Sequence, residues 1–203
     1  RRQKGKISVL ALGYQGGTGA LDAMGGKRMG LSPEDEAQIV VDYRAANPKI
    51  VKFWYDVEDA AKACALHHRT VQLRNLTFEM QKNGTMTITL PSGRPISYHA
   101  ITGSINRFGK ESLKFRGMNQ ESKKWGWIET YGGKLTENII QAIARDCLAE
   151  TMVRVEAAGF PVVFHVHDEL ICEVENTSDL DKIQEIFKEP IPWAEGLVYD
   201  EII

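Results

Sequence analysis

The pattern of polar and hydrophobic residues predicts helices across residues 32–68. Ser32 is followed by a proline and acidic residues, which is typical of a capping serine with proline at the first helical position. Apolar residues then recur along one face. The Asn-Pro pair at 47–48 should break the helix, so we expect a second helix over about 49–67.

The pattern changes between residues 70 and 130, where short β-prone runs are separated by turn-forming residues: TMTITL, PISYHA, SLKFRG and KKWGWIET. These runs predict antiparallel hairpins. Hydrophobic residues then recur at three- and four-residue steps over 135–158, which predicts a long helix, and a last helix is expected over 178–189. Because helices and strands are grouped rather than alternating, the predicted fold class is α+β.

The segment PVVFHVHDELICEVE is too long for one strand, because its 15 residues would extend about 50 Å. We expect a break at the polar residues 167–169, so that VVFHV and LICEV pair as a hairpin. Asp168 and Glu169 would then project from its tip. Adjacent carboxylates on a tight turn suit a hard cation such as Mg²⁺.

Two alternatives to a cation site at this turn stay open. The first is a plain acidic turn. The second is a zinc site formed by His165, His167 and Asp168. Histidines two residues apart share a strand face only if no turn intervenes, so the zinc site and the hairpin exclude each other.

The first residues, RRQKGKISVLALGYQGGTGAL, allow two interpretations. As a strand, ISVLAL would lead into a glycine-rich segment like a phosphate loop, but no GK[ST] follows and the glycine spacing does not fit GxGxxG. As a helix, one slowly turning face would carry residues four apart, namely Arg2, Lys6, Leu10 and Tyr14. Two cations, an apolar group and an aromatic ring match the phosphates, sugar and base of a nucleoside triphosphate. An ordinary amphipathic helix is the alternative.

Composition excludes several classes of protein. The chain has 203 residues, of which 43% are hydrophobic and 26% charged, unlike collagen-like, disordered or coiled-coil proteins. No apolar run approaches the roughly 18–20 residues of a membrane-spanning helix, and the basic and glycine-rich first residues are not those expected of a signal peptide. The three cysteines are scattered and form no CxxC, which fits a reducing cytoplasm: Cys64, Cys147 and Cys172.

Charge is unevenly distributed along the chain. Residues 167–203 carry 11 acidic residues and two lysines, whereas 103–125 hold six basic residues and two acidic ones. Such an asymmetry suits a polyanion held near a cation-binding carboxylate site. A solvated surface of mixed sign is the alternative.

Several blocks together resemble family-A DNA polymerases, the relatives of bacterial DNA polymerase I, and the phage and prophage members most closely. They are GKISVLALGYQGGTGAL, LPSGRPISY, WGWIETYGGKLTENIIQAIARDCLAE, VVFHVHDELICEVE and PWAEGL. The blocks extend from the first residues to the last dozen, so the resemblance covers essentially the whole chain. It implies a right-hand polymerase that adds dNTPs to a primer 3′-hydroxyl by two-metal phosphoryl transfer.

The resemblance implies a dNTP-binding group on the first helix. Arg2 and Lys6 match the cations that hold the incoming triphosphate. The resemblance also implies that Lys6 is a catalytic residue. Leu10 occupies the position at which bacterial relatives carry an aromatic residue against the sugar. Tyr14 matches the aromatic residue that stacks at the templating position. Gln15 stands where those relatives have glycine.

The resemblance also implies a DNA-binding and metal-binding group. Gln141 and Arg145 match a helix that faces the primer–template, with Gln141 reading the minor groove. His167 matches the histidine beside the primer end. Asp168 matches the catalytic Mg²⁺ ligand, with Glu169 as the neighbouring acid.

The family pattern divides the chain into three parts. Helical fingers occupy 1–69, a hairpin-rich segment joining fingers to palm occupies 70–134, and the palm helix with the catalytic hairpin occupies 135–203. The palm strand with the second metal-binding aspartate, and the thumb, precede the fingers in the family. We therefore expect this chain to be part of a longer polymerase, to supply half of the two-metal site, and to be inactive alone.

The expected partners are primer–template DNA and dNTPs, with no membrane partner, in the cytoplasm of a bacterial or phage-infected cell. Two rival functions remain. One is a non-catalytic nucleic-acid-binding module, and the other is a zinc hydrolase that uses His165 and His167.

Overall fold

A computed structural model describes residues 2–106, 108–176 and 178–196, with side chains from residue 5 onward. Two compact units are present, and each is described by itself. The first comprises Arg1–Ile88 and Pro95–Ile139, and the second comprises Thr89–Arg94 and Ile140–Ile203. Helices and antiparallel strands occur together, so the predicted α+β class is confirmed.

Helices form the beginning of the first unit: α1 (Arg2–Leu12), α2 (Thr18–Ala23), the short η1 (Lys27–Met29), α3 (Pro33–Ala46) and α4 (Pro48–His67). The predicted Ser32 cap of α3 is present. It is part of a capping box, because the Ser32 hydroxyl accepts from the Asp35 N–H and the Asp35 carboxylate accepts from the Ser32 N–H, each at 3.1 Å. Asn47 separates α3 from α4 as expected, and its side chain donates to the Tyr43 carbonyl oxygen at 2.8 Å.

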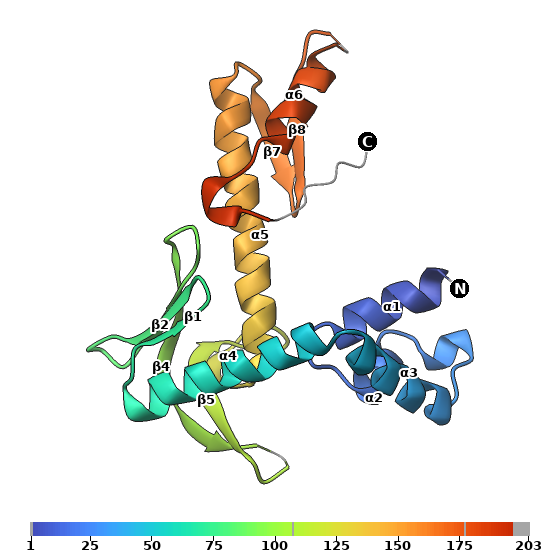
Figure 1. The fold of residues 1–203 in the computed structure, drawn as a ribbon, viewed down its shortest axis with the longest axis vertical. Coiled ribbons are helices and arrows are strands. Elements are labelled where there is room, and N and C mark those ends of the chain that lie inside the picture. The colour runs from blue at the N-terminus through green and yellow to red at the C-terminus, as the bar shows by residue number, and fades with distance from the viewer. Residues whose placement is uncertain (1, 107, 177, 197–203) are drawn as a thin grey trace. The chain divides into compact units, whose positions relative to one another are not determined.

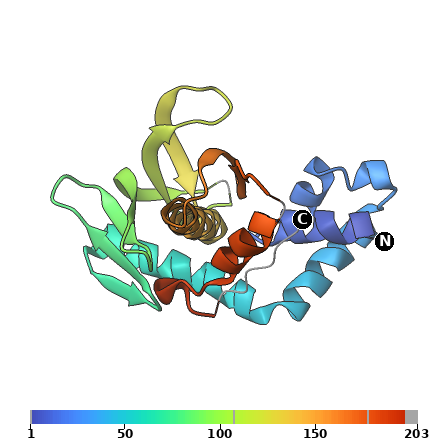
Figure 2. The ribbon, with the colours of Figure 1, turned by 90° about the horizontal axis from the view of Figure 1, so that it is seen from above.

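The predicted hairpins form one six-stranded sheet in the order β1-β2-β3-β4-β5-β6. Its strands are β1 (Val71–Leu73), β2 (Leu76–Met80), β3 (Met86–Thr89), β4 (Pro95–Ile105), β5 (Glu111–Met118) and β6 (Trp125–Thr130). Helix α4 contacts β1, β2 and β4. The core of this unit contains fully buried side chains from α4 (Trp54 and Val57), β2 (Phe78) and β3 (Ile88). Within this unit, the strands lie toward the C-terminal end of α4 and the helices α1–α3 toward its N-terminal end (Figures 1 and 2).

The remaining elements are α5 (Gly132–Ala157), β7 (Val162–Val166), β8 (Glu169–Cys172), α6 (Ser178–Lys188) and the short η2 (Pro192–Ala194). Helix α5 begins in the first unit and continues into the second. In the second unit, Ile191 and Ala194 are buried with Cys147 of α5, which holds the η2 segment on this helix. Arg154 of α5 adds hydrogen bonds to the Glu189 and Pro190 carbonyl oxygens at 3.0 and 3.4 Å.

Within the part of the chain that the structure describes, no helix is both long and apolar enough to span a membrane. The division into fingers (1–69), connecting segment (70–134) and palm (135–203) is a functional one, and it stays a prediction. Arg107, one of the basic residues of 103–125, lies outside the described residues.

Candidate functional site

The first group of candidates lies on α1, which forms a helix rather than a strand. Lys6 is exposed, and Leu10, one turn further on, is 53% exposed. The Arg2 backbone lies in the helix, but its side chain is outside the described part of the chain. The prediction that Tyr14 shares this helix face is wrong, because α1 ends at Leu12.

A contact from α4 explains why the chain leaves the helix before Tyr14. The indole N–H of Trp54 donates to the Gly13 carbonyl oxygen at 2.9 Å. Gln15 then adopts a φ of 67°, a left-handed conformation that turns the chain. Tyr14 is therefore part of a turn fixed by α4, and its side chain is half-buried.

The same turn contacts the start of α5. The Gln15 Oε1 accepts a hydrogen bond from the Gly133 N–H at 2.8 Å, and Glu58 Oε2 accepts one from the Gly132 N–H at 3.3 Å. N–H groups in the first turn of a helix have no partner within it, so these two side chains cap α5. A Cβ at Gly133 would overlap the Tyr14 carbonyl oxygen, which makes glycine necessary for this close approach.

The glycine-rich segment GYQGGTG connects α1 to α2. A helix rather than a strand precedes it, so it is not a strand-to-helix phosphate loop, and the helical interpretation of the first residues holds. Its role in the structure is to turn the chain and to cap α5 through Gln15.

The second group of candidates lies on the hairpin formed by β7 and β8. The strands pair antiparallel with Val166 opposite Glu169, so His167 and Asp168 form a two-residue turn. His167 has a φ of 52°, and a positive φ at the first turn residue matches the twist of paired strands. The predicted pairing is therefore present, although β8 ends at Cys172. The His167, Asp168 and Glu169 side chains are exposed.

Asp168 in the turn and Glu169 at the start of β8 offer two adjacent carboxylates to solvent, and oxygen donors of this kind suit Mg²⁺. It also separates His165 on β7 from His167, so the two histidines do not lie on one continuous strand. Among the described residues, no three His, Cys, Asp or Glu side chains are grouped so that they could hold a metal ion. The geometry thus gives no support to the zinc hydrolase.

Helix α5 presents Gln141 and Arg145 at its exposed surface in the second unit. The Arg145 guanidinium lies 3.5 Å from His165 Nε2, so the helix surface and the hairpin adjoin there. Asn138, three residues before Gln141 on α5, donates to the Tyr98 hydroxyl at 3.0 Å in the first unit. Burial raises the pKa of Tyr98 to about 12, so this phenol stays neutral.

Sequence analysis missed a polar cluster that holds the β3–β4 turn on α5. Asp146 accepts hydrogen bonds from the Ser92 hydroxyl at 2.5 Å and from Arg94 Nε at 2.6 Å. Arg94 also donates to the Ala142 carbonyl oxygen at 3.1 Å. In the sequence, the block LPSGRPISY indicates only a resemblance to the polymerase family. Its partner Asp146 on α5 lies more than 50 residues away, so local patterns do not indicate the contact.

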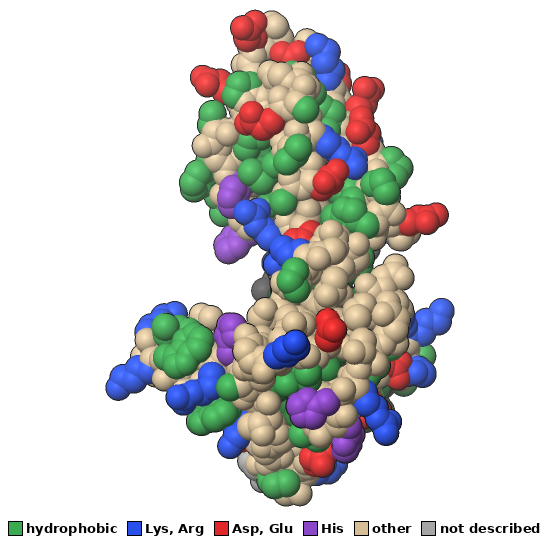
Figure 3. Space-filling view, turned by 90° about the vertical axis from the view of Figure 1, so that its left-hand side faces the viewer, with side chains coloured by type: hydrophobic (Ala, Val, Ile, Leu, Met, Phe, Trp, Pro, Cys, Tyr) green, Lys and Arg blue, Asp and Glu red, His purple; other side chains and the backbone are tan. Residues whose placement is uncertain are grey.

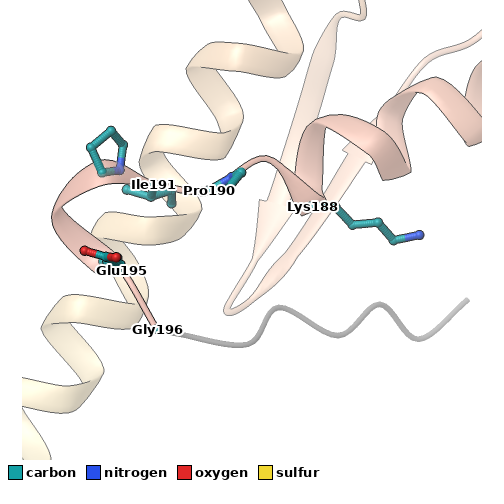
Figure 4. A pocket seen from close by; sticks show the side chains of 7 residues that line it. Lys188, Pro190, Ile191, Glu195 and Gly196 are labelled. Carbon is teal, nitrogen blue, oxygen red and sulfur yellow. The ribbon is translucent and has the colours of Figure 1, made fainter.

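A hollow in the second unit lies beside residues 188–196, between the end of α6 and the η2 segment (Figure 4). Lys188 and Glu195 are the charged residues at its wall. None of the candidate residues contributes to it, so the hollow adds nothing to the candidate site.

Comparison with known proteins bears on the resemblance. A DNA polymerase of Bacillus phage SP02 is 50% identical to this chain over 199 residues. The chain is similar to a phage DNA polymerase. The aligned part is 97% of this chain but 30% of the phage protein, so the chain spans less than a third of that polymerase. No family model and no solved structure matches the chain.

The predicted likeness to a DNA polymerase is thereby confirmed, whereas family A stays an expectation. Of the candidates, Lys6 and Leu10 share α1, and His167 and Asp168 share one hairpin turn, with Glu169 next to them at the start of β8. The roles of all the candidates are proposals.

Proposed function

We propose that this chain is part of a family-A, template-directed DNA polymerase that adds dNTPs to a primer 3′-hydroxyl. The observation that carries the proposal is the 50% identity to a phage DNA polymerase over 97% of the chain. Primer–template DNA and dNTPs are the substrates, and the cytoplasm of a bacterial or phage-infected cell is the location. No membrane partner is required.

In this proposal, Asp168 holds Mg²⁺, with Glu169 as the adjacent acid. The fit rests on two exposed carboxylates beside a two-residue turn, which a hard cation can approach from solvent. When bound, Mg²⁺ would stabilise the negative charge that develops on phosphate oxygens during phosphoryl transfer. A further carboxylate from elsewhere in the polymerase would complete a two-metal site.

The dNTP is held in this proposal by α1. Lys6, exposed on the helix, binds the triphosphate together with Arg2, and the two cations fix the position of the phosphates. Leu10 packs against the sugar one turn further on. Tyr14 stacks at the templating position from the turn rather than from the helix, so Trp54 and Gln15 determine its placement.

The primer–template is held by α5 and the hairpin. Gln141 and Arg145 project from the exposed surface of α5, where an amide and a guanidinium can reach the minor groove and phosphates. His167 lies directly before Asp168 in the turn, which suits a residue beside the primer end. Basic residues before residue 167 neutralise phosphates, so the affinity for DNA should fall steeply as salt rises.

The test is primer extension by the intact polymerase that contains this chain. Asp168→Asn should lower the rate by orders of magnitude and leave primer–template affinity nearly unchanged, because metal ligation acts on the transition state. Glu175→Asn, at an exposed acid beyond β8, is the matched control and should keep the activity. Normal extension by Asp168→Asn would sink the proposal.

A non-catalytic nucleic-acid-binding module is the second candidate function. The exposed tryptophans of β6, and the cations of β5 that lie against one of them, favour it. The same assay separates the two candidates. A binding module would bind DNA without extending a primer, whichever residue stands at 168.

A further inference from the structure

Two tryptophans are exposed on the last strand of the six-stranded sheet. Trp125 is 56% exposed and Trp127 is 50% exposed. Because they are two residues apart on β6, both project from the same face of the sheet. Large aromatic side chains are usually well buried, so a pair left in solvent on a regular strand indicates a binding surface.

Cations from the neighbouring strand lie against one of these rings. Lys114 Nζ is 5.0 Å from the centroid of the Trp127 ring, and the Arg116 guanidinium carbon is 5.1 Å from it. Both distances are within the range of cation–π attraction. Arg116 lies directly opposite Trp127 in the β5–β6 register, so the strand pairing fixes this arrangement.

The surface continues onto β4. His99 lies opposite Arg116 in the β4–β5 register, and its ring centroid is 6.3 Å from that of Trp125. We call His99, Lys114, Arg116, Trp125 and Trp127 the aromatic–basic face. Figure 3 shows hydrophobic side chains beside Lys and Arg side chains over this part of the sheet.

The register also places Met118 opposite Trp125, and the exposed Glu129 opposite Lys114, on the same face. Glu129 offsets part of the charge. The sequence around the face is nevertheless basic, because 103–125 hold six basic residues and two acidic ones.

We propose that the aromatic–basic face binds single-stranded nucleic acid by stacking bases on the tryptophans and neutralising phosphates with Lys114 and Arg116. A base stacked on Trp127 would bring its own phosphate close to the two cations, which is the combination that sequence-tolerant single-strand binding uses. A duplex hides the faces of its bases, so the rings select a single strand. That the strand is the template rests on the proposed function, whereas the binding itself does not.

The binding test uses the 203-residue chain and fluorescence anisotropy of labelled oligonucleotides. The probes are a short oligothymidylate, an abasic oligonucleotide of the same length, and a duplex. Wild-type protein should bind the oligothymidylate most tightly. Trp127→Ala should weaken that binding roughly 5–150-fold and leave the affinity for the abasic strand unchanged, because only base stacking is lost.

Three further variants make the test specific. Trp127→Phe keeps a stacking ring and should restore most of the affinity. Tyr55→Ala, at an aromatic residue of α4 that is 50% exposed, is the matched control and should bind as wild type does. Lys114→Gln should lower the salt dependence of binding by about 0.7 in the slope of log affinity against log salt.

Equal binding of oligothymidylate by wild-type protein and by Trp127→Ala, with unchanged thermal unfolding, would overturn the proposal. That result would favour a segment of protein as the occupant of the aromatic–basic face. Equal losses for the oligothymidylate and the abasic strand would also overturn it, since stacking would then not be the cause. Primer extension by Asp168→Asn tests the polymerase assignment, and oligonucleotide binding by Trp127→Ala tests this inference, so failure of the one and failure of the other give different results.

Discussion

Replacing Gln15 separates two opposing effects on the free energy of unfolding. Its side chain stabilises the start of α5, whereas its left-handed backbone destabilises the turn that holds Tyr14. The Gln15 side chain accepts a hydrogen bond from the Gly133 N–H at 2.8 Å and so caps α5. Its backbone has a φ of 67°, a conformation that costs a residue with a Cβ about 1–2 kcal/mol. Alanine removes the cap and keeps the strained backbone, whereas glycine removes both.

The expected order of stability is wild type, then Gln15→Gly, then Gln15→Ala. Loss of a capping side chain costs about 1–2 kcal/mol, which is the expected effect of alanine. Glycine recovers the left-handed penalty but loses about 0.5–1 kcal/mol through its more flexible unfolded chain. Gln15→Gly should therefore be up to about 1.5 kcal/mol more stable than Gln15→Ala.

Urea unfolding followed by circular dichroism measures these differences, provided that the denaturant slope stays constant among the variants. Gln120→Ala, in the exposed turn between β5 and β6, is the control and should stay within about 0.5 kcal/mol of wild type. If alanine matched wild type, the bond to Gly133 would contribute nothing to stability. If Gln15→Gly were less stable than Gln15→Ala, the backbone strain at Gln15 would be smaller than the entropic cost of glycine, which would contradict the expected order.

Three further predictions concern other parts of the chain. Arg94→Gln leaves the Asp146 carboxylate, whose side chain is 10% exposed, with only the Ser92 hydroxyl, and should cost about 1–3 kcal/mol in urea unfolding. A cost no larger than that of Lys27→Gln, which removes an exposed ion pair, would contradict this. In thiol titration with a disulfide reagent, Cys172 should react before Cys64, because Cys64 is fully buried and burial raises its pKa to about 11. If Cys64 reacted first, the burial of Cys64 in the folded chain would be refuted. The 203-residue chain with Mg²⁺ and all four dNTPs should not extend a primer, and extension above that of Asp168→Asn would show that it holds a complete metal site.

Local signals were sufficient for α3, for α4 and for the turn of the β7–β8 hairpin. The Ser32 cap and the break before Pro48 depend on residues adjacent in sequence, and both are present. The β7–β8 hairpin followed from the length limit on one strand together with a polar group in its middle. In each case the physical cause lies within about ten residues, so the sequence contains it.

Long-range contacts explain what the sequence did not indicate. Four-residue spacing predicted that Tyr14 continues the face of α1, but Trp54, 41 residues beyond Gly13, holds the Gly13 carbonyl oxygen and the chain turns there. The ion pair of Arg94 with Asp146 joins residues 52 apart. Periodicity reports which face of a helix is apolar, and it contains no information about which distant side chain will bind a free carbonyl or carboxylate.

The aromatic–basic face depends both on local sequence patterns and on a long-range contact. The sequence shows Trp125 and Trp127 in a β-prone run and basic residues at 114 and 116 in another, but the register between the runs decides whether they meet. A shift of one residue in that register would turn one set of side chains to the opposite face of the sheet. The observed register places Arg116 opposite Trp127 and thereby makes one surface of two separate patterns. The single-strand proposal therefore depends on strand pairing, while the metal proposal depends on the turn after β7, so each can fail without the other.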